Sequence, residues 1–304
     1  MTDGDRLVQL DILKALAIIA VIILHTQTVK LPFSEFYLDQ AVPIFLIVFA
    51  LTSTISFKKR GYTTLMQMYN GKDFLVRLQR VLLPILIIYL IPMLQLPFQN
   101  GPGFYFIFLV IEFILLFPIL YKIYCYNPKL FIAIAFILNL GFEIIAPNLQ
   151  MINENPKIYA EIILRYLFII SLGMFVAEDR DIFSKKNRFI LLGFAISVLY
   201  LVASSSSSGF FKDAWKSQDL FAGFYPLMIV LLSIRYLPKD LSRIYSKILS
   251  MIGKASYHIY IMQILFFSLG VGKDILYNLA YCIFAGLVFN AHKDKIEVFE
   301  DDVD

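Results

Sequence analysis

Lys14 and His25 are ionisable side chains inside the first apolar segment of the chain, residues 7–29. Such groups are costly within a membrane and usually face a protein interior or a watery cavity, so each is a functional candidate. They are eleven positions apart, which at about 100° per residue places them within roughly 20° on one helix face. Asp11 belongs to the same stripe. An imidazole accepts protons near neutral pH and an ammonium group attracts anions, so the stripe predicts proton transfer near an anionic group.

The helix expected to carry this stripe is one of many apolar runs in the chain. Hydrophobic residues make up 59% of the sequence and aromatic residues 16%. Several runs approach the ~20 residues that cross a hydrocarbon core. This composition excludes a soluble fold and predicts an all-α, polytopic integral membrane bundle of about ten transmembrane helices. No small-residue cleavage site follows the first run before Lys30, so we expect a retained helix rather than a signal peptide.

The predicted spans cover most of the chain. They are residues 7–29, 37–57, 81–96, 104–124, 130–147, 159–177, 189–203, 221–237, 252–271 and 275–290. The third, seventh and tenth are short for a membrane crossing. We find no internal repeat and no soluble segment large enough to fold alone. Residues 1–304 are therefore predicted to form a single transmembrane domain with an acidic cytoplasmic tail at 293–304.

The 27 Lys and Arg residues are distributed unevenly between alternate loops. Cytoplasmic loops of membrane proteins are enriched in these residues. With a cytoplasmic N-terminus, the outer loops hold only a minority: Lys30, Lys157, Lys212, Lys216 and Lys273. Both termini and the loop 58–80 are therefore predicted to be cytoplasmic in a multi-pass protein of the cell membrane. The net charge of +4 reflects this bias, and no motif predicts nucleic-acid binding.

Cys125 and Cys282 lie in apolar stretches without CxxC spacing. This arrangement predicts buried packing and gives no support for a disulfide framework or a metal site. The sequence also contains no glycine-rich phosphate-binding loop.

Three polar residues on different predicted spans share one depth. Counting about 1.5 Å per residue from the outer boundary, we place His25, Glu112 and Arg165 in the outer-leaflet half. Unpaired groups there would be costly, so we expect them to surround a polar cavity. Other interpretations stay open: His25 as a hydrogen bond between helices, Glu112 with Arg165 as a structural ion pair, and Lys14 as a side chain that reaches the cytoplasmic headgroups.

The segment between the second and third spans, KKRGYTTLMQMYNGKDFLVRLQR, mixes cations with apolar residues. Arg77 and Arg80 lie at the mouth of the third span, and arginine can hold phosphate in a bidentate fork. They therefore predict a site for a phosphorylated donor. An interfacial helix that sets the topology and contacts anionic membrane lipids explains the same segment equally well.

Six runs occur in order along the chain. They are RLVQLDILKALAIIAVIILH, QAVPIFLIVFAL, FLVRLQRVLLP, IEFILLFPIL, LRYLFIISLGMFVAE and GKASYHIYIMQ. Together they resemble the acyltransferase family 3 membrane proteins, the O-acyltransferases that modify surface polysaccharides, lipopolysaccharide and peptidoglycan. No single run is specific, but the six in this order are.

The resemblance implies that His25 is the catalytic histidine and Lys14 its paired basic residue. The supporting positions that it implies are Arg77, Arg80, Glu112 and Arg165. Many members have a histidine after the Ser-Tyr run, where this chain has Gln263. A glutamine side chain does not titrate, so we expect no proton transfer at this position, whereas a hydrogen-bonding role would be retained.

The expected reaction moves an acyl group, with acetyl as the first candidate, from a cytoplasmic acyl-CoA to a hydroxyl of a surface polysaccharide or glycolipid. His25 would take the hydroxyl proton, Glu112 would orient the imidazole, and Arg165 or a backbone donor would stabilise the developing charge. Transient acylation of His25 is an alternative. No cofactor is expected, since acetyl-CoA is the donor substrate.

Lys14, with Asp11 beside it, would attract the anionic donor, and Arg77 and Arg80 would hold its phosphates. The rival function is an exporter or flippase of a glycan or lipid-linked sugar, in which the same polar groups line a pathway. The absence of repeats and of paired broken helices in the sequence argues weakly against transport.

Overall fold

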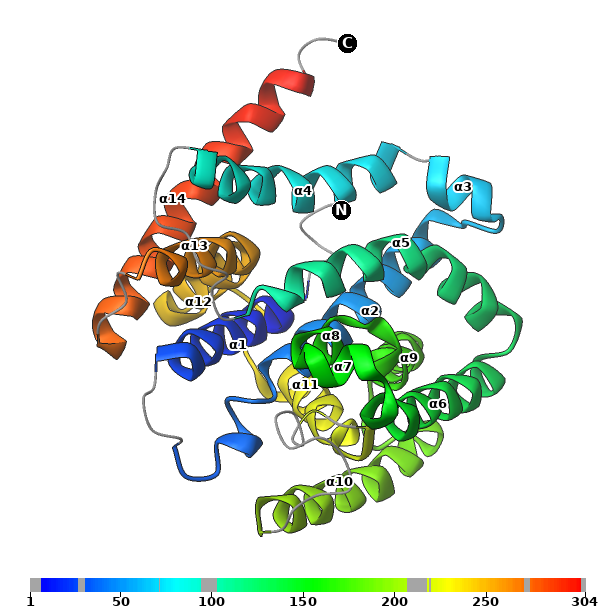
Figure 1. The fold of residues 1–304 in the computed structure, drawn as a ribbon. Coiled ribbons are helices and arrows are strands. Elements are labelled where there is room, and N and C mark those ends of the chain that lie inside the picture. Colours follow the sequence, from blue (N-terminus) through cyan, green and yellow to red (C-terminus); the bar gives the residue numbers. More distant parts are fainter. Residues whose placement is uncertain are drawn as a thin grey trace. The chain divides into compact units, whose positions relative to one another are not determined.

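A computed structural model of the chain describes residues 7–26, 31–70, 72–93, 103–206, 218, 220–270 and 274–301. These residues fold into α-helices joined by turns and short 3-10 helices (Figure 1), which confirms the all-α prediction. Their contacts divide the chain into two compact units. Unit 1 comprises Met1–Pro32, Leu82–Phe104 and Tyr236–Asp304, and unit 2 comprises Phe33–Val81 and Tyr105–Arg235.

Several helical segments are long and apolar enough to cross a membrane. Among the described residues they are Val8–Thr26, Ser34–Arg60, Tyr105–Tyr126, Pro128–Asn148 and Ile275–His292. Shorter apolar helical segments cover Ile163–Val176, Arg188–Ala203 and Leu220–Tyr236. Helices satisfy their own backbone hydrogen bonds, which the hydrocarbon interior demands. The protein is therefore a polytopic membrane protein.

Unit 1 is built around the first helix. Its helices are α1 (Val8–Thr26), α12 (Ile244–Lys254), α13 (Ser256–Ser268) and α14 (Ile275–Asp301). Helix α1 packs mainly along α12 and also contacts α13 and α14, which pack on each other (Figure 1). The predicted span 252–271 is wrong as a continuous helix, because α12 ends at Lys254 and α13 starts at Ser256. The predicted ends at 27–29, at 94–96 and at 271 lie outside the described residues.

The close contact between α1 and α12 depends on Gly253. A Cβ atom at this position would lie 1.8 Å from the backbone oxygen of Asp11 and 2.6 Å from its carbonyl carbon. Both atoms belong to a helix backbone that cannot yield as a flexible side chain does. A glycine in the GKASYHIYIMQ run therefore allows the helix that carries Asp11, Lys14 and His25 to pack directly on α12.

We expect Gly253→Ala to destabilise the protein by about 1–3 kcal/mol, the usual cost of overpacking a tight contact. Thermal unfolding of the purified protein in detergent measures the effect. Gly141→Ala is the matched control, since a Cβ there meets nothing within 4 Å. Alanine is the better helix former by about 1 kcal/mol, so the control should be at least as stable as the wild type. Equal stability of the two variants would contradict the close contact.

Unit 2 contains the remaining helices apart from α4 (Lys72–Met93), which is divided between the two units. They are α2 (Ala41–Arg60), α3 (Leu65–Asn70), α5 (Tyr105–Tyr126), α6 (Pro128–Ile145), α7 (Gln150–Glu154), α8 (Pro156–Glu161), α9 (Leu167–Val176), α10 (Arg188–Ser206) and α11 (Phe224–Tyr236). Its 3-10 helices are η2 (Ser34–Phe36), η3 (Ala146–Asn148), η4 (Ile163–Tyr166), η5 (Lys185–Asn187) and η7 (Leu220–Ala222). Every residue of α9 is buried, and this helix packs on α2 and α6. Helix α9 is therefore the core of the unit.

Two further predicted spans also begin or break differently from the sequence-based expectation. The span 159–177 is divided into α8, η4 and α9. Asn155 starts α8 by accepting a hydrogen bond from the Lys157 N–H, with Pro156 as the first helical residue. The third span starts earlier than predicted, as α4 (Lys72–Met93), which begins in unit 2 and continues in unit 1. Arg77 and Arg80 therefore lie within a helix and not in a loop before it.

The prediction that both cysteines are buried is half wrong. Cys282 is fully buried in α14, whereas Cys125 is exposed. Cys125 lies in the last turn of α5, next to the exposed Tyr126, where the helix leaves the packed part of unit 2. An apolar neighbourhood in sequence does not reveal where a helix emerges from its bundle.

Candidate active site

His25 lies in the last turn of α1, half-buried, beside two residues from distant parts of unit 1. A Cβ atom on Gly103 would lie 3.2 Å from His25 Nε2 and 3.5 Å from Cε2 of Tyr260. The Tyr260 hydroxyl donates a hydrogen bond to the Gly103 carbonyl oxygen. Gly103 has a φ of 90°, a left-handed conformation that glycine adopts at little cost. Glycine thus provides both the backbone conformation and the space beside the imidazole.

Sequence reasoning did not single out Gly103 or Tyr260. Tyr260 is the second tyrosine of the GKASYHIYIMQ run, so a signal for it was present, although that run gave no reason to place it beside His25. Gly103 follows Pro102 in a short polar stretch before α5 that reads as an ordinary turn. Gly103 becomes a functional candidate because it lies beside His25, and Tyr260 because it is hydrogen-bonded to Gly103.

Other polar groups of unit 1 hold the helix that carries His25. Asp11 and Lys14 form an ion pair of 2.8 Å between Oδ1 and Nζ, in which the Lys14 side chain is 19% exposed and that of Asp11 only 4%. At the other end of α1, Asn278 donates from Nδ2 to Thr26 Oγ1 at 3.1 Å. Asp11 and Lys14 of the predicted stripe are therefore in contact, and the lysine charge is compensated within its own helix.

Gln263 is fully buried on α13, one helical turn after Tyr260. Within the described part of the chain, neither its amide nitrogen nor its amide oxygen has a hydrogen-bond partner. Buried polar groups are normally satisfied, so each exception calls for an explanation. Both amide atoms of Gln263 can therefore still form hydrogen bonds, which is the role expected of a glutamine at this position.

Glu112, on α5 in unit 2, binds the backbone at the break in the predicted span 159–177. Its carboxylate oxygen Oε2 accepts a hydrogen bond of 2.8 Å from the backbone N–H of Ile163. In a continuous helix that N–H would donate to the carbonyl four residues earlier. The contact fixes η4 and with it the start of α9. Glu112 therefore supports the turn that positions Arg165.

Arg165 is completely buried in an aromatic and acidic enclosure. Its Nε lies 3.9 Å from Oε1 of Glu143. The guanidinium carbon lies 4.3 Å from the ring centroid of Tyr159 and 5.2 Å from that of Tyr166, within the range of a cation–π interaction. The Tyr159 hydroxyl donates to the other Glu143 oxygen.

The acidic partner of Arg165 is therefore Glu143, and not Glu112 as the ion-pair interpretation had it. Sequence reasoning missed Glu143. A signal was present, because an acidic residue inside the apolar span 130–147 is as unusual as Glu112 in its own span.

Arg77 and Arg80 differ in their surroundings. Arg77 Nη2 donates to Ser56 Oγ at 2.9 Å, and its guanidinium carbon lies 5.0 Å from the ring centroid of Phe57. These contacts attach α4 to the end of α2 within unit 2. Arg77 is half-buried, whereas Arg80 is exposed. Of the two arginines, Arg80 presents more of its surface to a ligand.

The predicted site residues are shared between the two units. Those in unit 1 are Asp11, Lys14, His25 and Gln263, and those in unit 2 are Arg77, Arg80, Glu112 and Arg165. The structure brings His25 together with Gly103 and Tyr260, and Arg165 together with Glu143. An imidazole in a membrane helix, with a glycine beside its Nε2, is suited to taking a proton from a hydroxyl substrate.

Comparison with known protein families identifies the family of the chain. The family 3 acyltransferase model, described as an acyltransferase domain, matches residues 7–290. This range includes every predicted site residue and covers most of both units. Comparisons with curated proteins and with solved structures returned no match. The chain, a polytopic membrane protein with a histidine near the end of its first helix, therefore belongs to acyltransferase family 3 and is a membrane-bound O-acyltransferase.

Proposed function

We propose that the protein transfers an acetyl group from cytoplasmic acetyl-CoA to a hydroxyl of a surface polysaccharide or glycolipid, with His25 as the general base. The surroundings of His25 carry the proposal. The imidazole lies in an apolar helix, and Gly103 lies beside it without a side chain: a Cβ atom there would be only 3.2 Å from Nε2. Its neutral form is the one that accepts a proton, and an unperturbed imidazole is largely neutral at physiological pH.

In the proposed reaction, His25 removes the proton from the acceptor hydroxyl as the oxygen attacks the thioester carbonyl. The carbon–sulfur bond then breaks, and the proton passes from the imidazole to the leaving thiolate. The Tyr260 hydroxyl, which donates to Gly103, keeps that backbone segment beside the imidazole. Within unit 2, Glu112 holds the backbone of η4, and Arg165 pairs with Glu143 just before α9.

Donor binding falls mainly to exposed cations in this proposal. Asp11 already compensates the charge of Lys14, so we assign Lys14 a smaller electrostatic role. Arg80 is exposed and is assigned a contact with a donor phosphate, while Arg77 holds the position of α4 through Ser56. Gln263 is assigned a hydrogen bond to substrate, because its amide is buried and still able to pair.

The proposed orientation has both termini in the cytoplasm. The carboxyl ends of α2, α5 and α9 meet around one cavity of unit 2, together with Lys58, Lys59 and Arg180. Helix ends that meet in this way lie on the same side of the membrane, and their cations match the positive-inside rule.

We expect a cysteine introduced at Lys59, in a Cys125→Ser background, to resist an impermeant maleimide in intact cells. The same residue should react once the membrane is permeabilised, because Lys59 is exposed at the end of α2. Labelling of this cysteine in intact cells would mean that the predicted topology is wrong. A cysteine at Lys157, which is exposed and predicted to lie outside, is the positive control.

We expect Gly103→Ala to lower acyl transfer severely. The new methyl group would lie 3.2 Å from His25 Nε2. The alanine would also have to adopt the φ of 90° that Gly103 has, a left-handed conformation that costs a non-glycine residue roughly 1–2 kcal/mol. Initial rates measured on purified protein, normalised to folded protein, report the effect. Gly141→Ala, which adds a methyl group in open space of unit 2, should retain full activity. Unchanged turnover in Gly103→Ala would remove this residue from the site.

The substrate assignment is tested by mass spectrometry of surface glycans from cells with and without the protein. Loss of an acetyl mass increment supports the proposal, and loss of a succinyl increment would replace acetyl as the transferred group. If the glycan disappears from the surface while its composition is unchanged, the exporter alternative is correct.

A further inference from the structure

Unit 2 contains a cavity of about 430 Å³ that the proposed reaction does not yet use. The volume lies within the range of small-molecule sites, roughly 300–1,000 Å³. The cations Lys58, Lys59 and Arg180 line it, together with the acid Glu178 and the aromatic residues Tyr121 and Tyr124. It is therefore a pocket of ligand size whose charged lining is predominantly positive.

The cations come from two separate segments. Lys58 and Lys59 are in the last turn of α2, where positive charge also interacts favourably with the helix dipole. Arg180 comes from the loop after α9 and has no such reason to be there. The dipole explains the lysines, but it does not explain an arginine brought to the same cavity by a loop.

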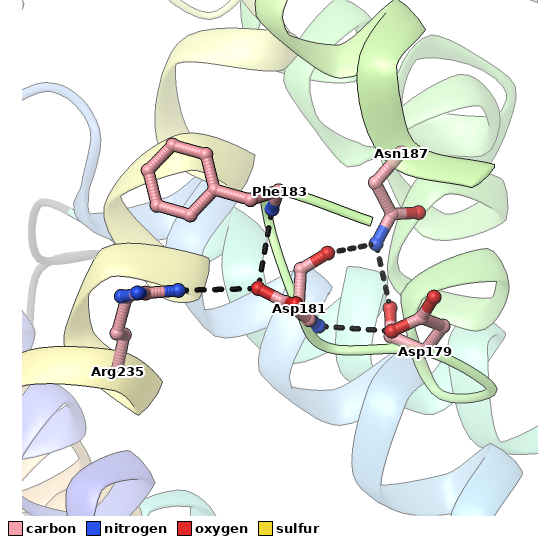
Figure 2. Close-up of polar contacts among 5 residues, drawn as sticks. All are labelled: Asp179, Asp181, Phe183, Asn187 and Arg235. Atoms are coloured by element: carbon pink, nitrogen blue, oxygen red, sulfur yellow. Dashed lines mark hydrogen bonds and ion pairs between the residues drawn. The ribbon is translucent and has the colours of Figure 1, made fainter. Parts of the chain in front are cut away.

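The loop that carries Arg180 is fixed by a network of polar contacts, shown in Figure 2. The Asn187 amide donates to the backbone oxygens of Asp179 at 3.0 Å and of Asp181 at 2.7 Å, so it holds the residues on both sides of Arg180. The Asp181 carboxylate accepts hydrogen bonds from the Phe183 N–H and from Arg235 Nη1 at 3.1 Å (Figure 2). The backbone of Arg180 is thus placed by its neighbours and is not a freely moving surface segment.

The acidic residue in the lining, Glu178, is hydrogen-bonded to another lining residue. Glu178 Oε1 accepts a hydrogen bond of 3.0 Å from the Tyr124 hydroxyl. Three cations then face one carboxylate around the cavity. Like charges gathered in one pocket repel each other, and an anion between them relieves the repulsion. Arginine and lysine together are the usual protein groups for binding phosphate.

We propose that this cavity binds a phosphate group, with Lys58, Lys59 and Arg180 as its ligands. Two sources can supply that chemistry: the adenosine bisphosphate end of an acyl-CoA, or the headgroup of an anionic phospholipid. The first source rests on the proposed function, and the phosphate site itself does not. Tyr121 and Tyr124 add aromatic surface for a purine beside the phosphates.

The native cysteine Cys125 reports on occupancy without any measurement of acyl transfer. It is exposed and lines the cavity, whereas Cys282 is fully buried. The full-length protein in phosphatidylcholine nanodiscs is treated with a thiol reagent, with and without adenosine 3′,5′-bisphosphate, which carries no thiol. If bound bisphosphate shields Cys125, only the fraction of protein without ligand reacts with the thiol reagent. Labelling should therefore slow about tenfold when the bisphosphate concentration is ten times its dissociation constant.

The two sources give different results. Protection by the bisphosphate in phosphatidylcholine identifies the nucleotide end of the donor. Protection that requires phosphatidylglycerol in the nanodisc, with no effect of the bisphosphate, identifies a lipid headgroup. No protection under either condition would overturn the phosphate site.

A matched pair of variants tests the ligands. Arg180→Gln should reduce the protection, and Lys185→Gln, which removes an exposed cation of the same loop outside the cavity lining, should leave it unchanged. Equal protection in wild type and in the combined Lys58→Gln, Lys59→Gln, Arg180→Gln variant would overturn the assignment. His25→Ala separates this site from the proposed function, because it should lose acyl transfer and keep the protection of Cys125.

Discussion

His25→Ala is expected to lower the rate of acyl transfer about 10²–10⁴-fold, the usual contribution of a general base. The protein should still insert and fold. The substitution removes one half-buried polar group from a helix whose other contacts with α12, α13 and α14 are unchanged. Incorporation of radiolabelled acetyl from acetyl-CoA, divided by the amount of folded protein, measures the effect.

The exposed His292 on α14 provides the matched control for this experiment. His292→Ala removes the same side chain and should retain the wild-type rate. Total surface glycan is measured in the same cells, since a transporter would lose glycan export in His25→Ala without losing acetylation of the product. Normal acetyl incorporation in His25→Ala would refute the role of this residue as the base.

The helices with long apolar runs could be predicted from the sequence because composition alone determines them. Predicted spans 104–124 and 130–147 correspond to α5 and α6, and the Asn127 cap with Pro128 explains why α6 starts where it does. The break within 159–177 could not be predicted in this way. It depends on the Glu112 side chain, which is distant in sequence and takes the Ile163 N–H.

The candidate site was predictable to the extent that one helix carries it. The spacing of Lys14 and His25 predicted a polar face, and two residues of that face, Asp11 and Lys14, form an ion pair. Partners from other segments could not be found by periodicity. Gly103 and Tyr260 reach His25 only because the chain folds back, and the same is true of Glu143 beside Arg165.

Removal of Arg165 is expected to cause the largest loss of stability in the described part of the chain. Arg165→Ala leaves the Glu143 carboxylate buried without its cation, which costs about 3–5 kcal/mol for a fully buried pair. Both side chains of the pair have an exposed fraction of 0%. The substitution also removes the cation–π contacts with Tyr159 and Tyr166. Thermal unfolding and the amount of protein in the membrane should both fall.

A surface ion pair of the same chemistry is the control. Arg235 pairs with Asp181 at 3.1 Å, but the two side chains are 44% and 57% exposed. Exposed pairs contribute only about 0–1 kcal/mol, so Arg235→Ala should change stability little. A similar loss in both variants would mean that burial of the Arg165 pair is not the cause.

The double variant Arg165→Met, Glu143→Leu separates a structural role of the pair from a direct catalytic one. Replacing both partners of a buried ion pair with apolar residues is often neutral or stabilising, so the double variant should recover much of the stability that Arg165→Ala loses. If Arg165 contributes to acyl transfer only through the stability of unit 2, acyl transfer per folded molecule should recover with it. Recovered stability with acyl transfer still abolished would instead place the guanidinium in contact with the reacting groups.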